Sequence, residues 1–161
     1  MDEAAKIIAQ FGLQPLPAEG GWFRQTWAAP AADPDGRPAG TAILYLITRD
    51  GFSALHRLRM DEVWHFYAGD AVRLVELDPA TGQAGAVRLG ADPLAGQQPQ
   101  HVVRADVWQG ARLAGQNGRG WALLGCTLVP GWDQRDFAMA NRRDLLAQFP
   151  QAEADIVALT R

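Results

Sequence analysis

The chain has 161 residues, of which 48% are hydrophobic and 20% charged, and its formal net charge is −3. This composition excludes a disordered chain and supplies enough apolar side chains for one folded core. Because Lys and Arg do not recur as a cluster on any expected face, nucleic acid and anionic membranes are disfavoured as partners, and a small-molecule ligand is favoured.

The single cysteine, Cys126, excludes an internal disulfide framework and a thiolate-rich metal site. It lies in an apolar run, so we expect a buried core thiol rather than a nucleophile. No apolar run approaches the roughly 20 residues that span a bilayer, and the segment Met1-Asp2-Glu3 is acidic, unlike a secretory signal. We therefore expect a cytoplasmic protein.

The N-terminal part of the chain predicts one short helix followed by strands. Asp2 can cap a helix that Gly12 and two prolines terminate. Residues 22–27 read as a strand with an aromatic residue on both faces, and residues 28–40, with three prolines, as a loop. The apolar, β-rich residues 41–47 predict a strand that is buried on both faces.

Short strands continue to the C-terminal region, where helices return. The predicted strands cover residues 72–77, 86–89, 100–103, 107–113 and 121–129. Asn141 can cap a helix over residues 142–149, and Pro150 can open a second helix that extends to Leu159. The fold class predicted is mainly β, a barrel or sandwich formed by one domain over residues 1–161.

The central segment, residues 51–69, predicts a β-hairpin that carries a site. Side chains alternate across a strand, so His56 and Leu58 share one face of its first strand. By the same alternation Glu62, Trp64 and Phe66 share one face of its second strand. If both faces point inward, an imidazole and a carboxylate meet inside an apolar pocket.

The spacing of Gly51, His56, Leu58, Glu62 and Gly69 resembles the first sequence motif of the cupin superfamily. The segment Arg104-x-Asp106-x-x-Gln109 falls where the second cupin motif is expected. Over nearly the whole chain, further segments resemble an uncharacterised cupin subgroup with a yeast structural representative. These segments are Glu19-Gly-Gly-Trp-Phe-Arg24, Asp61-Glu-Val-Trp-His-Phe-Tyr67, Gln109-Gly-Ala-Arg112 and Gly125-Cys-Thr127 followed by Pro130-Gly131.

This resemblance implies a cupin double-stranded β-helix, the jelly-roll barrel of RmlC-like proteins, with a ligand pocket inside it. It also implies a homodimer and kinship with nucleotide-sugar epimerases and other cupin isomerases. A homodimer would in addition cover unpaired strand edges.

The chain departs from the metal-binding cupin pattern at two positions. Cupins that hold a metal usually supply histidines where this chain has Leu58 and Gln109, so only His56 and Glu62 match the ligand set. A leucine cannot ligate, and a neutral amide oxygen is a weaker ligand than imidazole for iron, nickel or zinc. A divalent metal at His56, Glu62 and Gln109 is therefore an alternative, and no cofactor is the favoured expectation.

Without a metal, the chemistry expected at this site is proton transfer. Histidine changes charge near neutral pH, and apolar walls formed by Trp64 and Phe66 would raise the pKa of Glu62. In the sugar epimerases that the fold resembles, a pocket histidine removes a proton beside a carbonyl, and His56 matches its motif position. A tyrosine that assists in those enzymes has no confident counterpart here, since the chain has only Tyr45 and Tyr67.

The other expected ligand-binding residues are Arg24, Leu58, Trp64, Phe66 and Gln109. The two aromatic rings suit a wall that stacks on a sugar or planar ring. Arg24 could clamp a phosphate or carboxylate of the ligand, or instead form an ion pair with Glu19, Asp61 or Glu62.

Three functions remain open at this point. The favoured one is a small-molecule-binding cupin that works as a metal-independent isomerase or epimerase on a carbohydrate-like or nucleotide-sugar ligand. The alternatives are a metal-dependent cupin enzyme and a binding protein without catalytic activity.

Overall fold

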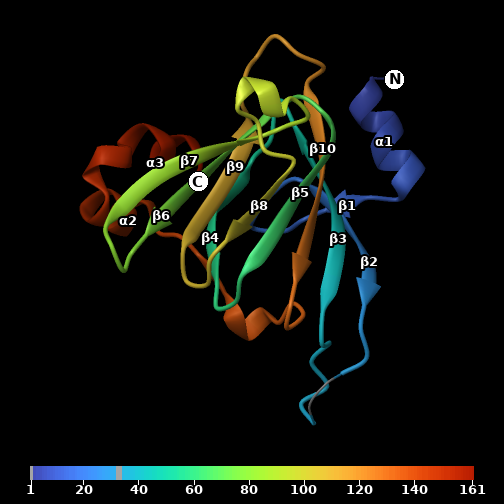
Figure 1. Ribbon diagram of the computed structural model, residues 1–161, viewed down its shortest axis with the longest axis horizontal. Coiled ribbons are helices and arrows are strands. Elements are labelled where there is room, and N and C mark those ends of the chain that lie inside the picture. The colour runs from blue at the N-terminus through green and yellow to red at the C-terminus, as the bar shows by residue number, and fades with distance from the viewer. Residues whose placement is uncertain (1, 32–33) are drawn as a thin grey trace.

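The computed structural model describes residues 2–31 and 34–161 and shows two antiparallel sheets that face each other (Figure 1). The first sheet has the spatial order β1 (Gln14–Pro15), β2 (Trp22–Ala28), β3 (Thr41–Thr48), β10 (Trp121–Leu128), β5 (Glu62–Gly69) and β8 (Gln100–Val103). The second has the order β11 (Phe137–Met139), β4 (Ser53–Leu58), β9 (Trp108–Leu113), β6 (Val72–Asp78) and β7 (Gln83–Leu89). Strands distant in sequence thus become neighbours, as in a jelly roll.

Helices cover the outer faces of the two sheets. They are α1 (Glu3–Phe11), α2 (Arg142–Gln148) and α3 (Glu153–Ala158), with short 3₁₀ turns η1 (Pro93–Ala95), η2 (Gln134–Asp136) and η3 (Pro150–Ala152). In Figure 1, α2 and α3 lie beside the second sheet, whereas α1 lies beside the first near β10. None of the helices in the described residues is both long enough and apolar enough to cross a membrane.

The predicted helix caps are confirmed. The Asp2 side chain accepts a hydrogen bond from the Ala5 N–H at 2.7 Å, and Gly12 ends α1 in the left-handed conformation with φ 59°. Asn141 caps α2 by accepting from Asp144. Pro150 opens η3 instead of the predicted continuous helix, and α3 begins only at Glu153.

The main core lies between the two sheets and is built from the inward side chains of their strands. Large, almost fully buried residues of this cluster include Tyr45, Ile47, Trp64, Leu74 and Leu124. A second cluster fills the space between the second sheet and the C-terminal helices, and a third joins α1 to the first sheet. Because both outer faces are partly covered by helices, the strands carry apolar residues on both sides.

The predicted hairpin over residues 51–69 is wrong in one respect. β4 pairs with β9 and β11, whereas β5 pairs with β10 and β8, so the two strands belong to different sheets. Residues 59–61 carry the chain across from one sheet to the other. Alternation along each strand is as predicted, and because the sheets face each other, the inward sides of β4 and β5 still converge.

Part of the loop predicted over residues 28–40 cannot be compared, because Ala32 and Asp33 lie outside the described residues. The remainder forms one bridge, between Ala31 and Pro38, beyond the ends of β2 and β3. β11, a short strand after η2, was not anticipated from the sequence; it pairs with β4 and places Phe137 beside Leu58.

Candidate functional site

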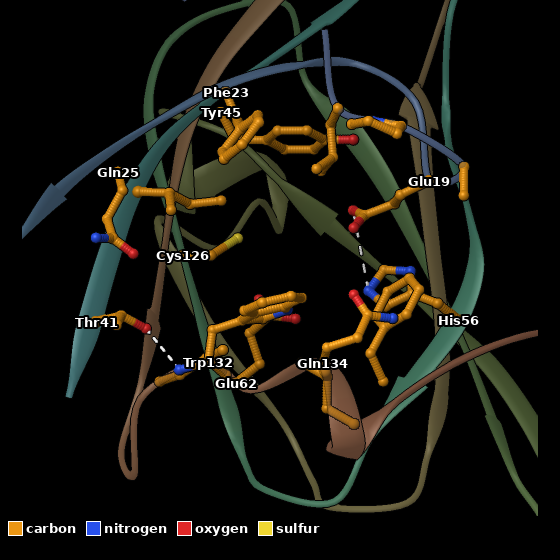
Figure 2. Close-up of a pocket in the computed structure, with 17 residues that line it drawn as sticks. Glu19, Phe23, Gln25, Thr41, Tyr45, His56, Glu62, Cys126, Trp132 and Gln134 are labelled. Atoms are coloured by element: carbon orange, nitrogen blue, oxygen red, sulfur yellow. Dashed lines mark hydrogen bonds and ion pairs between the residues drawn. The ribbon is translucent and has the colours of Figure 1, made fainter. Parts of the chain in front are cut away.

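A cavity of about 480 Å³ opens between the two sheets (Figure 2). A volume of this size is within the range of pockets that hold small organic molecules. Its lining residues come from the segment before β2, from the inner faces of β2, β3, β4, β5 and β10, and from the segment after β10. They are Leu16, Pro17, Ala18, Glu19, Phe23, Gln25, Thr41, Ile43, Tyr45, His56, Leu58, Glu62, Cys126, Leu128, Trp132, Gln134 and Phe137.

His56, from the middle of β4, lies in the cavity wall and is only 2% exposed. Its Nδ1 lies 2.8 Å from the carbonyl oxygen of Ala54. A carbonyl oxygen only accepts, so Nδ1 must carry the proton, and in the neutral ring Nε2 is left with a free lone pair. Phe137 stacks on the imidazole with 5.5 Å between ring centroids, which holds the ring in its plane.

Glu19 is the acidic neighbour of His56. One carboxylate oxygen, Oε1, lies 3.9 Å from His56 Nε2, and the Ser53 hydroxyl donates to the same oxygen at 2.7 Å. This distance to Nε2 is an ion-pair distance rather than a hydrogen bond, so the Nε2 lone pair is not consumed. Figure 2 shows Glu19 and His56 together on one side of the cavity.

A tight turn before β2 places Glu19. Gly20 has φ 97° and Gly21 has φ 73°, backbone conformations that favour glycine. The Tyr45 hydroxyl donates to the Gly20 carbonyl oxygen at 2.7 Å, and the Ala54 N–H donates to the Glu19 carbonyl oxygen at 2.8 Å. The turn is thus tied to both sheets at once. Burial raises the pKa of Tyr45 well above its usual value, so this hydroxyl stays protonated.

Glu62 opens β5 and lies on the cavity wall contributed by the other sheet, with 6% of its surface exposed. Burial raises the pKa of this carboxyl to about 7, while the charge of His56 acts in the opposite direction. Its oxygen Oε2 is buried without a hydrogen-bond partner. The predicted rise in the pKa of Glu62 is confirmed, but Trp64 and Phe66 are not the walls of its pocket.

Four of the predicted ligand-binding residues lie away from the cavity lining: Arg24, Trp64, Phe66 and Gln109. Trp64 shares the inner face of β5 with Glu62 but is deeper in the core, where its indole N–H donates to the amide oxygen of Gln109 at 2.7 Å. Phe66 packs against the same core cluster. Alternation along a strand determines which face a side chain occupies but not its depth. The aromatic residues that do line the cavity are Phe23, Tyr45, Trp132 and Phe137.

Leu58 and Arg24 have opposite placements. Leu58 lines the cavity, as predicted, from the same face of β4 as His56. On β2 the side chains of Phe23 and Gln25 line the cavity, so Arg24 between them points to the outer face, where it is exposed. Arg24 therefore does not reach a ligand inside this cavity.

Glu19, Cys126, Trp132 and Phe137 line the cavity, although the sequence did not predict them there. The Gly20-Gly21 pair indicates a turn after Glu19, but it does not indicate which residue the Glu19 side chain approaches. Cys126 is buried as expected, and burial raises the pKa of its thiol well above the usual value, but it also lines the cavity. Trp132 and Phe137 follow β10 in a segment without the periodic apolar pattern that predicts a strand or a helix, so its course could not be predicted from the sequence.

The residues present do not fit the three-residue metal site considered from the sequence. The amide oxygen of Gln109 accepts a hydrogen bond from Trp64 in the core, and Gln109 does not line the cavity with His56 and Glu62. Leu58 offers carbon where a ligand nitrogen is required. Across residues 2–31 and 34–161, no group of three or more His, Cys, Asp or Glu side chains is arranged to hold a metal ion.

Gly20→Ala is expected to lower the free energy of unfolding by about 2 kcal/mol. An added Cβ would lie 2.5 Å from the carbonyl oxygen of Phe52, a backbone atom that cannot rotate away. The control is Gly82→Ala, because Gly82 has a similar φ of 73° but open space around it, and should lose only about 1 kcal/mol. Urea unfolding measures both values, and equal losses would contradict the close approach at Gly20.

Two antiparallel sheets that close around an inner pocket, with a histidine and a glutamate on facing walls, define a barrel of the cupin class. Residues 5–140 match the family described as Cupin superfamily (DUF985). The chain belongs to this family. This membership confirms the resemblance drawn from the motifs around His56 and Gln109.

Solved structures agree with this assignment. Protein SO0799 from Shewanella oneidensis is 31% identical, with a TM-score of 0.91 over 100% of this chain and 99% of that one. A hypothetical protein from Leishmania major is 30% identical, with a TM-score of 0.87 over 98% of each chain. A dTDP sugar isomerase from Desulfovibrio desulfuricans is 18% identical, with a TM-score of 0.58 over 88% of this chain and 87% of that one, which shows a shared fold alone. No curated protein sequence matches.

Proposed function

We propose that the chain binds a small organic molecule in this cavity and catalyses proton transfer on it, as a metal-independent isomerase or epimerase of a carbohydrate-like carbonyl compound. The observation that carries the proposal is the orientation of His56. Its Nδ1–H is engaged by the Ala54 carbonyl oxygen, so in the neutral ring the lone pair of Nε2 is free to act as a base.

The expected step is removal of a proton from a carbon next to a carbonyl group. His56 Nε2 takes the proton, and the Glu19 carboxylate, 3.9 Å from Nε2, stabilises the imidazolium that results. Glu62 lies on the other sheet and has a pKa of about 7, so near neutral pH it can accept or supply a second proton. Groups on two facing walls suit proton removal and return at different faces of a flat intermediate.

The nucleotide-linked form of the expected ligand has less support than the small carbonyl compound. A diphosphate needs cationic or backbone N–H partners, and none of the described lining residues is Lys or Arg. Arg24, the expected clamp, lies on the outer face of β2. The proposed ligand is therefore carbohydrate-like and carries no diphosphate.

Deuterium incorporation tests the proposal. Wild-type protein is incubated in heavy water with small keto-sugars, unlinked and nucleotide-linked, and exchange at the carbon beside the carbonyl is followed by proton NMR. We expect exchange with an unlinked compound. A lack of exchange with every compound, together with a ligand that co-purifies, would instead support a binding protein without catalytic activity.

The metal-dependent alternative has a separate test. Elemental analysis of protein purified without chelators, compared with His56→Ala, would support it if stoichiometric metal were present and then lost in the variant. The homodimer also stays a prediction, since it follows from the family resemblance and from uncovered strand edges. Light scattering during gel filtration gives the mass in solution that checks it.

A further inference from the structure

The most unusual atom of the cavity is Oε2 of Glu62. This oxygen is buried without a hydrogen-bond partner, in a residue of which only 6% is exposed. Leaving a buried carboxyl oxygen unpaired is energetically costly, so such an atom usually marks the place of a missing partner. Glu62 lines the cavity, so a rotation of its carboxyl group toward a bound molecule would give this oxygen a partner.

The charge of the cavity indicates what kind of partner fits. Its lining contains two carboxylates, Glu19 and Glu62, and one imidazole, His56, but no Lys or Arg among the described residues. Two arginines hold the walls without lining them. Arg161 donates to the Ala18 carbonyl oxygen at 2.8 Å, and Arg37 pairs with Asp136 at 2.8 Å. Neither neutralises the carboxylates from inside the cavity.

The remaining walls are mostly apolar and include four aromatic rings. Figure 2 shows Phe23 and Tyr45 on one side of the cavity and Trp132 and Glu62 on the opposite side. A cation placed between aromatic faces and a desolvated carboxylate gains from both, since ring faces carry negative charge. An anion in the same place would face two like charges in a region with little water.

We infer that the ligand carries a protonated nitrogen, an amine or amidine, which donates to the carboxylate of Glu62. This inference rests on the proposed function only in taking the cavity as the binding site, and it names the ligand's charge. In the bound state Glu62 is ionised and anchors the nitrogen. With such a ligand Glu62 is not the second proton-transfer group of the proposed function, and His56 both removes and returns the proton. An amino-bearing carbonyl compound satisfies both groups.

Three probes of nearly the same shape and different charge test the inference. Benzamidine is a cation, benzamide is neutral and benzoate is an anion, and binding of each is measured by calorimetry at pH 8. We expect benzamidine to bind wild-type protein about tenfold or more tightly than benzamide, with benzoate weakest, because a charge-assisted hydrogen bond is stronger than a neutral one.

Glu62→Gln should remove most of this preference, whereas Glu76→Gln should retain it, because Glu76 pairs with His101 and does not line the cavity. Glu19→Gln serves as a second variant in case Glu62→Gln fails to fold, and should reduce the preference partly. Benzoate binding as tightly as benzamidine would overturn the inference, as would an unchanged preference in Glu62→Gln or no benzamidine binding at millimolar concentration.

The two proposals can fail separately. Charge preference without deuterium exchange would leave the ligand assignment standing and contradict the catalytic proposal. Exchange on an anionic compound that binds more tightly than a cationic one would support catalysis and contradict the ligand assignment.

Discussion

His56→Asn is expected to slow deuterium exchange on an active compound by at least about 100-fold, because positioned general bases typically contribute factors of 10² to 10⁴. Asparagine is the sharpest replacement, since its amide N–H can still donate to the Ala54 carbonyl oxygen that Nδ1 now contacts at 2.8 Å. It offers no lone pair with the basicity of Nε2. The loss should appear in kcat, measured by NMR at saturating substrate.

The matched control is His65→Asn. His65 lies on β5, where its Nε2 is 3.0 Å from the Thr127 hydroxyl, and it does not line the cavity. Its replacement should leave the exchange rate within a factor of about two. Equal rates for wild type and His56→Asn, with both proteins folded by circular dichroism, would rule out His56 as the base.

Glu62→Gln is expected to stabilise the protein at pH 8 by about 3 kcal/mol relative to wild type, while near pH 4 the two should be similar. Burial raises the pKa of Glu62 from 4.5 to about 7. A raised carboxyl pKa means that the folded state binds more protons than the unfolded state between these values, so stability falls as pH rises through that window. Each tenfold change in proton affinity corresponds to about 1.4 kcal/mol.

Urea unfolding at several pH values measures this difference. Glu3→Gln is a control of opposite sign, because hydrogen bonds from Arg119 and Trp121 lower the pKa of Glu3 to about 2. Removing that carboxylate should decrease stability at pH 8. A constant difference between wild type and Glu62→Gln from pH 4 to pH 8 would mean that Glu62 titrates normally in the folded state.

Much of the fold could be predicted because its signals are local. Alternating or continuous apolar runs indicated the strands of the central sheets, and Asp2 and Asn141 marked helix starts that the structure confirms. Pairing between strands is not local, and the assignment of β4 and β5 to one hairpin failed for that reason. Nothing in three connecting residues distinguishes a tight turn from a crossing between sheets.

The site was predicted in part. The cupin-like spacing placed His56, Leu58 and Glu62 around one cavity, as the structure shows. Trp64 was assigned to the lining because it shares a face with Glu62, but depth along the strand depends on how far the sheets close over it. Glu19 could not be assigned from its own neighbourhood, since its approach to His56 depends on a turn that contacts β4.

Because the chain crosses from one sheet to the other between β4 and β5, the geometry of the site depends on how the two sheets pack together. His56 and Glu62 are close in sequence yet each is held by its own sheet, so their separation follows any sliding or splaying of one sheet against the other. Interior substitutions far from either residue, such as at Leu74 or Leu124, should therefore change the rate of the proposed proton transfer through inter-sheet spacing. Changes in the size of buried apolar side chains would then retune this site without altering a single polar group of the pocket.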